Sequence, residues 1–183
     1  VSVFGADPIK LGEAIVDGDG NFSYELTEEN LRSIGEGGNK SITARQTDVA
    51  GNSSEPTEPF PYAVDITLTP PVAITSIGGD DSVVSSQNND NQIVGIAEAG
   101  ATVELFAVTG TDEILLGEVI ADGDGNFSYP LTEENLSSLG EGENKAIKAT
   151  QTDAAGNSES TQPFTFAVDT TLSPQLSITS VGG

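Results

Sequence analysis

Apolar and polar side chains alternate in short runs along this chain, and turn-forming residues separate the runs. Residues 22–26 place Phe22, Tyr24 and Leu26 on one face of an extended segment. Similar alternation recurs within 126–131 and 162–169. A period of two is typical of β-strands that are buried on one face. The chain is therefore predicted to be all-β.

Between residues 69 and 172 the pattern predicts seven strands. They cover 72–77, 92–97, 102–108, 114–120, 126–131, 145–152 and 162–169. Seven short strands in about 100 residues are typical of an immunoglobulin-like β-sandwich. One helix-like stretch, 131–139, is expected to end at Gly140, because glycine favours helix termination. The predicted fold is a series of tandem, seven-stranded, immunoglobulin-like sandwiches.

The chain repeats itself at a spacing of about 104 residues. The sequence of residues 17–24 returns unchanged at 122–129, and 29 of the 39 residues in 17–55 recur 105 positions later. A one-residue deletion then changes the offset to 104, so that 63–65 matches 167–169. A repeat of this length is a whole domain rather than one unit of a solenoid.

The register of the repeat predicts three segments. Residues 69–172 form one complete repeat, 1–68 correspond to strands C to G of a preceding one, and 173–183 begin a third. The fragment is therefore expected to come from a longer array, with neighbouring repeats as partners. Because 1–68 lack the first two strands, their core is expected to be open on one side. Either the neighbouring domain holds that half, or residues 175–181 of another molecule donate a strand to it.

The charge is strongly acidic, with 29 Asp and Glu against 6 Lys and Arg among 183 residues, a formal net charge of −23. This excess argues against binding to nucleic acid or anionic lipid, since phosphate binding depends on Lys and Arg. It favours divalent cations as partners. No stretch approaches the ~20 apolar residues of a membrane-spanning helix, so direct membrane insertion is not expected.

The chain contains no Cys and no His. Disulfides, thiolate metal sites and histidine-based catalytic triads are therefore excluded. A pair of carboxylates acting as in a glycosidase is the main catalytic route left, and nothing distinguishes one pair from the rest. The protein is predicted not to be an enzyme.

Acidic loops are expected to gather at the two ends of the sandwich. If the strands alternate in direction, one end carries loops 98–101, 122–126 and 153–157, and the other carries 78–81 and residue 169. Neighbouring carboxylates repel one another, whereas Ca²⁺ accepts roughly 6–8 oxygen ligands from such side chains. Calcium is therefore the predicted cofactor. The predicted ligands are Asp17, Asp19, Asn21, Asp48, Asp65, Asp80, Asp81, Asp122, Asp124, Asn126, Asp153, Asn157 and Asp169.

Asp65 lies in a short, Pro-containing linker, where a cation would connect two domains. Two other interpretations remain open for these loops. The spacing from Asp122 to Glu133 resembles an EF-hand loop, although Phe127 replaces the glycine required at position six. Alternatively, Asp and Gly simply suit hairpin turns, and Asp65 only caps the end of a strand.

The motif Thr-Asp-Ala-Ala-Gly-Asn at 152–157, Val-Asp-Thr-Thr at 168–171 with a nearby proline, and the sequence 122–129 resemble the bacterial immunoglobulin-like repeats of giant RTX adhesins. The resemblance implies an extracellular protein, secreted by a type I system and held at the surface of Gram-negative bacteria. It implies an extender that projects ligand-binding domains from the cell, with calcium at the domain junctions. In the first linker, Ile66 replaces the threonine that the second linker has at Thr170. A hydroxyl contact from this position of the first linker is therefore in doubt.

A second function is a calcium-dependent binding module for a surface glycan or another ligand. Repeated, nearly identical loops and an aromatic content of 5% weigh against it, because few aromatic side chains remain for stacking on a sugar.

Overall fold

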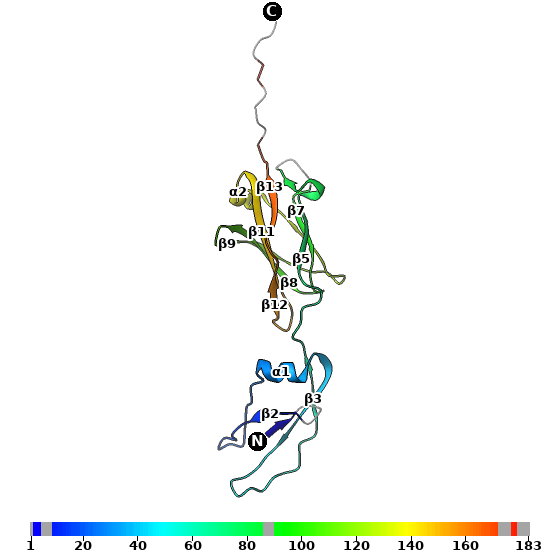
Figure 1. The fold of residues 1–183 in the computed structure, drawn as a ribbon, viewed down its shortest axis with the longest axis vertical. Helices are drawn as coiled ribbons and strands as arrows, with labels where there is room; N and C mark the ends of the chain where they lie inside the picture. Colours follow the sequence, from blue (N-terminus) through cyan, green and yellow to red (C-terminus); the bar gives the residue numbers. More distant parts are fainter. Residues whose placement is uncertain (1, 5–8, 86–89, 172–176, 179–183) are drawn as a thin grey trace, which may run out of the picture. The chain divides into compact units, whose positions relative to one another are not determined.

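The computed structural model describes residues 2–4, 9–85, 90–171 and 177–178. The chain divides into two compact units, Val1–Thr67 and Leu68–Gly183, which are described separately (Figure 1). The expected strand in 173–183 lies outside the described residues, apart from 177 and 178. In the part of the chain that the structure describes, neither helix has the length or apolar character needed to cross a membrane.

The second unit is a sandwich of two β-sheets (Figure 1). One sheet has the order β10-β7-β5, from β5 (Ala73–Ile77), β7 (Gln92–Ile96) and β10 (Asn126–Pro130). The other has the order β6-β13-β11-β8-β9, with β12 paired to β11. Its strands are β6 (Val83–Val84), β8 (Thr102–Thr109), β9 (Asp112–Ile120), β11 (Gly142–Thr152), β12 (Ser158–Ser160) and β13 (Phe164–Val168).

The seven strands expected in this unit are all present within a few residues of their predicted limits, and the all-β sandwich is confirmed. Two short strands were not expected. β6 has only two residues, too few to show alternation, and it pairs in parallel with β13. β12 has the sequence Ser-Glu-Ser, which contains no apolar residue to signal a strand.

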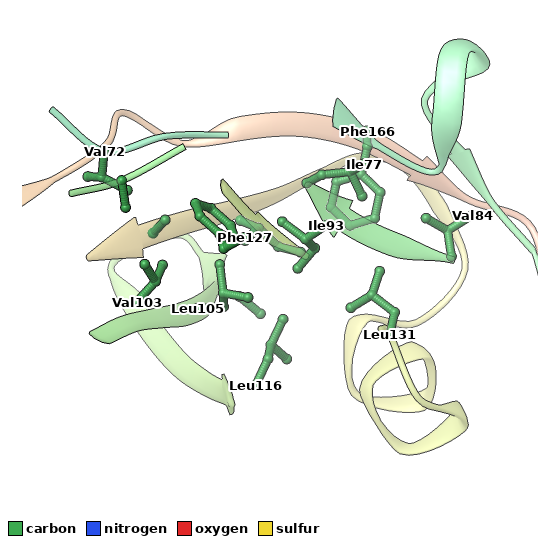
Figure 2. Packing of buried hydrophobic residues seen from close by; sticks show 14 of the residues in the cluster. Val72, Ile77, Val84, Ile93, Val103, Leu105, Leu116, Phe127, Leu131 and Phe166 are labelled. Carbon is green, nitrogen blue, oxygen red and sulfur yellow. The ribbon is translucent and has the colours of Figure 1, made fainter. Parts of the chain in front are cut away.

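Apolar side chains from both sheets meet in the interior of the second unit (Figure 2). Ile77 and Ile93 from one sheet and Leu105 and Ile147 from the other are completely buried. Phe127 is 3% exposed. The predicted inward phase of the alternating strands is therefore the phase that forms the core.

A short helix, α2 (Glu133–Leu139), covers one end of this core with the buried Leu136. Thr132 and Asn135 cap its first turn reciprocally, and Gly140 ends it, so the expected helix is confirmed. The Asn135 side-chain amide also donates to the carbonyl of Leu116 at 3.1 Å, and the Tyr129 hydroxyl donates to the same oxygen at 2.7 Å. The Asn135 bond attaches the helix to β9, and the Tyr129 bond attaches β10 to the same residue of β9.

The first unit is a single sheet with the order β2-β1-β3-β4. Its strands are β1 (Ser2–Phe4), β2 (Lys10–Glu13), β3 (Gly37–Arg45) and β4 (Phe60–Val64). This order matches β9-β8-β11-β13 of the second unit. Helix α1 (Glu28–Ile34) repeats the capping of α2, with Thr27 and Asn30 in the reciprocal positions.

The expectation of a strand at 22–26 is wrong, because this segment lies outside the strands. Its counterpart β10 pairs along its whole length with β7. Among the described residues of the first unit no strand corresponds to β7, so the segment has the alternation of a strand without the backbone partner that makes one. Phe22 is consequently 45% exposed.

Candidate metal site

Four acidic loops share one turn with the sequence Asp-x-x-Gly-Asn. They are residues 17–21, 48–52, 122–126 and 153–157. In each, Oδ1 of the aspartate accepts hydrogen bonds from the backbone N–H groups two and four residues later, at 2.8–3.0 Å. The glycine has a φ of 80–91°, a left-handed conformation that glycine adopts without strain. The first aspartate of each motif therefore stabilises its own turn.

Hydrogen bonds within the turns lower the pKa of three of the aspartates. The side-chain amide of Asn52 is the main cause for the pKa of Asp48, and that of Asn157 for the pKa of Asp153. The backbone N–H of Asn126 is the main cause of the lowered pKa of Asp122. All three carboxylates are therefore charged at neutral pH, as metal binding requires.

Three loops meet at the end of the second unit where its chain enters, as the strand directions predicted. The pairing of Thr102 with Thr152 brings loops 98–101 and 153–157 together. The N–H of Ala97 donates to the carbonyl of Gly125 at 2.8 Å, which attaches loop 122–126. This end of the sandwich therefore collects acidic loops that are distant in sequence.

Glu98 and Asp153 form an acidic pair at this end. One carboxylate oxygen of each lies within 4.8 Å of the other, and both side chains are half-buried. Glu98 was not among the predicted ligands, although its loop was placed at the correct end. Among the described residues, no three acidic side chains within either unit bring oxygens within this distance of one another. The two carboxylates by themselves offer fewer oxygens than the roughly 6–8 ligands that Ca²⁺ takes.

The other predicted ligands of the second unit are distributed between its two ends. Asp124 and Asn126 lie exposed in the turn begun by Asp122. At the opposite end, Asp80 and Asp81 belong to the 3₁₀ turn η1 (Gly79–Asp81), where Asp81 accepts from the N–H of Val83 at 3.0 Å. Asp169 lies at that end too, because its N–H donates to the carbonyl of Val84 at 2.9 Å.

In the first unit, Asp17, Asp19 and Asn21 lie in one turn, Asp48 begins another, and Asp65 follows β4. An EF-hand loop is not formed by 122–133. The extended strand β10 separates the Asp122 turn from Glu133, which begins α2.

Residues 80–169 match the family model described as a bacterial Ig domain. The matched residues lie within the second unit. Comparison of the chain with curated proteins gave no match.

Two solved structures resemble the chain. One is described as a Ca²⁺-stabilized adhesin that helps an Antarctic bacterium reach out and bind ice; it is 22% identical, with a TM-score of 0.42, over 93% of this chain and 40% of that one. The other is a tetra-tandem repeat in the extending region of a large adhesion protein, 19% identical with a TM-score of 0.40, over 92% of this chain and 40% of that one. The chain thus spans less than half the length of either.

The second unit holds its incoming segment through a buried glutamine. Gln151 is completely buried, and its side-chain amide donates to the carbonyl of Pro70 at 3.1 Å and to Glu159 at 2.9 Å. Its side-chain oxygen accepts from the N–H of Glu98 at 2.8 Å. Glu98 in turn accepts from the N–H of Thr69 at 2.8 Å. The segment that enters the domain is therefore bonded to the acidic end.

Glu141 holds the segment that leaves the sandwich of the second unit. It accepts from the N–H of Thr170 at 2.8 Å and from the Thr170 hydroxyl. In the first unit, Glu36 accepts from the N–H of Ile66 at 3.0 Å and from the Thr67 hydroxyl at 3.4 Å. Ile66 has no hydroxyl group, and the next residue, Thr67, makes the hydroxyl contact instead.

Proposed function

We propose that the chain is a structural extender segment of a bacterial cell-surface adhesin, in which calcium ions at domain junctions make the array rigid. The observation that carries the proposal is the position of Glu98. Its carboxylate holds the backbone of Thr69, where the chain enters the second unit, and also lies beside Asp153. A cation bound by this pair would therefore act directly on the connection between domains.

The electrostatics of the pair favour a divalent cation. Two unit charges about 5 Å apart repel by roughly 1 kcal/mol even in bulk water, and by more near protein. The salt bridges among the described residues involve Glu13, Glu28 and Glu113 and leave both Glu98 and Asp153 without a basic partner. Calcium takes roughly 6–8 oxygen ligands, including backbone carbonyls and water. It would relieve the repulsion between the two carboxylates and recruit ligands from nearby segments.

Asp65 is the proposed ligand from the preceding unit. It lies four residues before Thr69, and four extended residues span at most about 14 Å. The linker therefore keeps Asp65 within reach of the end that carries Glu98. Asp122 and Asp124, in the adjacent loop, are proposed to complete the site directly or through water.

The same arrangement is proposed to continue along the array. Asp169 is the counterpart of Asp65 and would serve a following repeat, together with Asp80 and Asp81 at the same end. Asp17, Asp19, Asn21 and Asp48 are the counterparts of the 122–126 and 153–157 loops and would serve a preceding one. In this role the protein is extracellular at the surface of a Gram-negative cell, reached by type I secretion.

Thermal unfolding tests the proposal. The chain is melted in excess EDTA, with millimolar Ca²⁺, and with millimolar Mg²⁺, and small-angle scattering measures its extension. A ligand bound only by the folded state stabilises it by about 2.7 kcal/mol at a hundredfold excess over Kd. We expect a calcium-specific rise of several degrees in Tm and a longer, less variable particle.

Two variants assign that effect to the site. Glu98→Gln and Asp65→Asn should each reduce the calcium-dependent rise, whereas Glu118→Gln, on an exposed position of β9, should leave it intact. Equal Tm values in EDTA and in calcium would contradict the calcium assignment. The extender would then depend on its hydrophobic core and on the Gln151 and Glu141 contacts alone.

A further inference from the structure

Some asparagines of this chain are followed two residues later by a serine, with no proline between the two. They are Asn21, Asn39, Asn52, Asn126 and Asn135. The sequence Asn-x-Ser is the acceptor pattern for N-linked sugars, which are attached at the surface of a protein. Because so short a pattern is common by chance, the surroundings of each asparagine decide which of them is accessible as an acceptor.

Asn135 is withdrawn from the surface. It is 8% exposed in the first turn of α2, and its side-chain nitrogen, Nδ2, donates to the carbonyl of Leu116 at 3.1 Å. Its side-chain oxygen accepts from the N–H of Thr132 at 3.0 Å. The acceptor atom of N-linked sugars is Nδ2, and here that atom is buried and already bonded. The folded second unit therefore does not present Asn135 to an enzyme.

Three of the asparagines close Asp-x-x-Gly-Asn turns. Their carbonyls accept from the N–H of the first aspartate, at 2.8 Å for Asn21 and Asn126 and at 2.9 Å for Asn52. Their own N–H groups donate to Oδ1 of the same aspartate at 2.8 Å. Nδ2 of Asn52 also donates to the carboxylate of Asp48 at 2.8 Å. A transferase must hold the acceptor segment in its own active site, and these segments are already bonded within their turns.

Asn39 is exposed and does not belong to such a turn. It lies in β3, where the pairing with β4 changes register. Gly37 pairs with Val64, but Lys40 pairs with Tyr62, so that three steps along β3 match two along β4. One residue of β3 therefore bulges out of the ladder. Among the described residues, the side chain of Asn39 makes no hydrogen bond, so its Nδ2 is accessible.

The second unit has the same position without the serine. Asn144 corresponds to Asn39, is also exposed, and lies beside a matching change of register between β11 and β13. The residue two positions later is Ala146, where the first unit has Ser41. Exposure of this asparagine is therefore common to both units, and the acceptor pattern is complete only in the first.

We propose that Asn39 is the acceptor of an N-linked sugar, attached by a glycosyltransferase. The donor is a sugar whose anomeric carbon carries a diphosphate leaving group. Nδ2 of Asn39 forms a bond to the anomeric carbon, the bond from that carbon to the diphosphate oxygen breaks, and one Nδ2 proton passes to a base of the transferase. The hydroxyl of Ser41 completes the sequence that the transferase recognises. The sugar adds a bulky, hydrated group to the surface of the first unit.

Peptide mapping by mass spectrometry tests this proposal on the protein isolated from the cells that produce it. We expect the peptide that contains Asn39 to carry the added mass of a sugar. The asparagines expected to be unmodified are Asn21, Asn52, Asn126, Asn135 and Asn144. A nucleotide-activated donor adds one monosaccharide at a time, whereas a lipid-linked donor adds a preassembled oligosaccharide. The added mass therefore distinguishes the two sources of the activated sugar.

Variants produced in the same cells assign the modification to the pattern. Ser41→Ala gives the first unit the sequence Asn-Lys-Ala of 144–146 and should abolish the added mass, whereas Ser41→Thr keeps a hydroxyl and should retain it. Ser23→Ala is the matched control, because it removes the serine that follows Asn21 and should leave the mass unchanged. An unmodified Asn39, or an added mass that survives Ser41→Ala, would overturn the proposal. Calcium plays no part in these outcomes, so the extender role is tested separately.

Discussion

The side-chain amide of Gln151 donates a hydrogen bond to the carbonyl of Pro70, 81 residues earlier in the chain, at 3.1 Å. The same side chain is completely buried and also binds the N–H of Glu98 and the carboxylate of Glu159. Buried polar groups of this kind are costly to leave without partners. Gln151 therefore fixes the entering segment to the core of the second unit.

Replacement of Gln151 by Leu should destabilise the second unit. The substitution preserves approximate volume but leaves the Glu98 N–H and the Pro70 carbonyl without their partner. Each unsatisfied buried group costs about 1–3 kcal/mol, so we expect a loss of about 2–4 kcal/mol in the free energy of unfolding. Urea unfolding followed by circular dichroism measures this change.

The chain supplies its own control for that measurement. Gln46 occupies the corresponding position of the first unit but is exposed. Gln46→Leu should therefore change the free energy of unfolding by no more than about 0.5 kcal/mol. Equal losses for Gln46→Leu and Gln151→Leu would show that the buried network does not stabilise the domain.

Gly95 lies directly beneath the ring of Phe127. A Cβ atom at residue 95 would be 2.3 Å from a ring carbon of Phe127 and 2.3 Å from the carbonyl oxygen of Ala73. Gly95→Ala must therefore displace the ring or separate β5 from β7. We expect a loss of about 1–3 kcal/mol in the free energy of unfolding, as for other overpacked cores.

Gly123→Ala is the matched substitution. A Cβ atom there meets nothing within 4 Å, and the backbone is not in the left-handed region. Differential scanning calorimetry should find the Tm of Gly123→Ala close to that of the unchanged protein and the Tm of Gly95→Ala clearly lower. Nearly equal Tm values would mean that Phe127 can move at little cost.

The Asp153 turn should make stability sensitive to acid. The side-chain amide of Asn157 holds the pKa of Asp153 below its ordinary value of 3.8. A carboxylate with a lowered folded-state pKa stabilises the protein fully above its unfolded pKa and loses that contribution as pH falls through the folded value. In EDTA, Asp153→Asn should therefore lower Tm by a constant amount between pH 7 and pH 5, and the difference should shrink below about pH 4.

Asp124→Asn provides the comparison for the pH series. The corresponding position holds alanine in two of the four turns, at Ala50 and Ala155, so the turn does not require a carboxylate there. We expect no comparable loss of Tm at neutral pH. An Asp153→Asn difference that stays constant down to pH 2 would show that the charge of Asp153 does not stabilise the turn.

Local sequence was sufficient to predict most elements of the second unit. The alternation in β10 and β13 is a property of a few neighbouring residues, because side chains of a strand point to opposite faces at a period of two. The limits of α2, capped by Thr132 and Gly140, also depend only on neighbouring residues, since capping groups lie within one turn of the helix. Four similar turns follow from the five-residue motif Asp-x-x-Gly-Asn.

Tertiary structure decided the features that need a distant partner. Residues 21–25 and 126–130 differ only at their last position, yet only the second segment is a strand, because only it lies beside a strand such as β7. Gln151 is buried and Gln46 is exposed for a related reason: Pro70 and the strand that follows it cover only the former. Backbone pairing and burial depend on what another part of the chain places alongside a segment.

The candidate metal site divides in the same way. Its acidic loops and the end of the sandwich at which they gather followed from strand order and composition. The pairing of Glu98 with Asp153 did not, because it arises from the register of β8 on β11, in which Thr102 lies opposite Thr152. Sequence by itself therefore determined which residues carry charge and form turns, and the long-range register of the sheet decided which carboxylates meet.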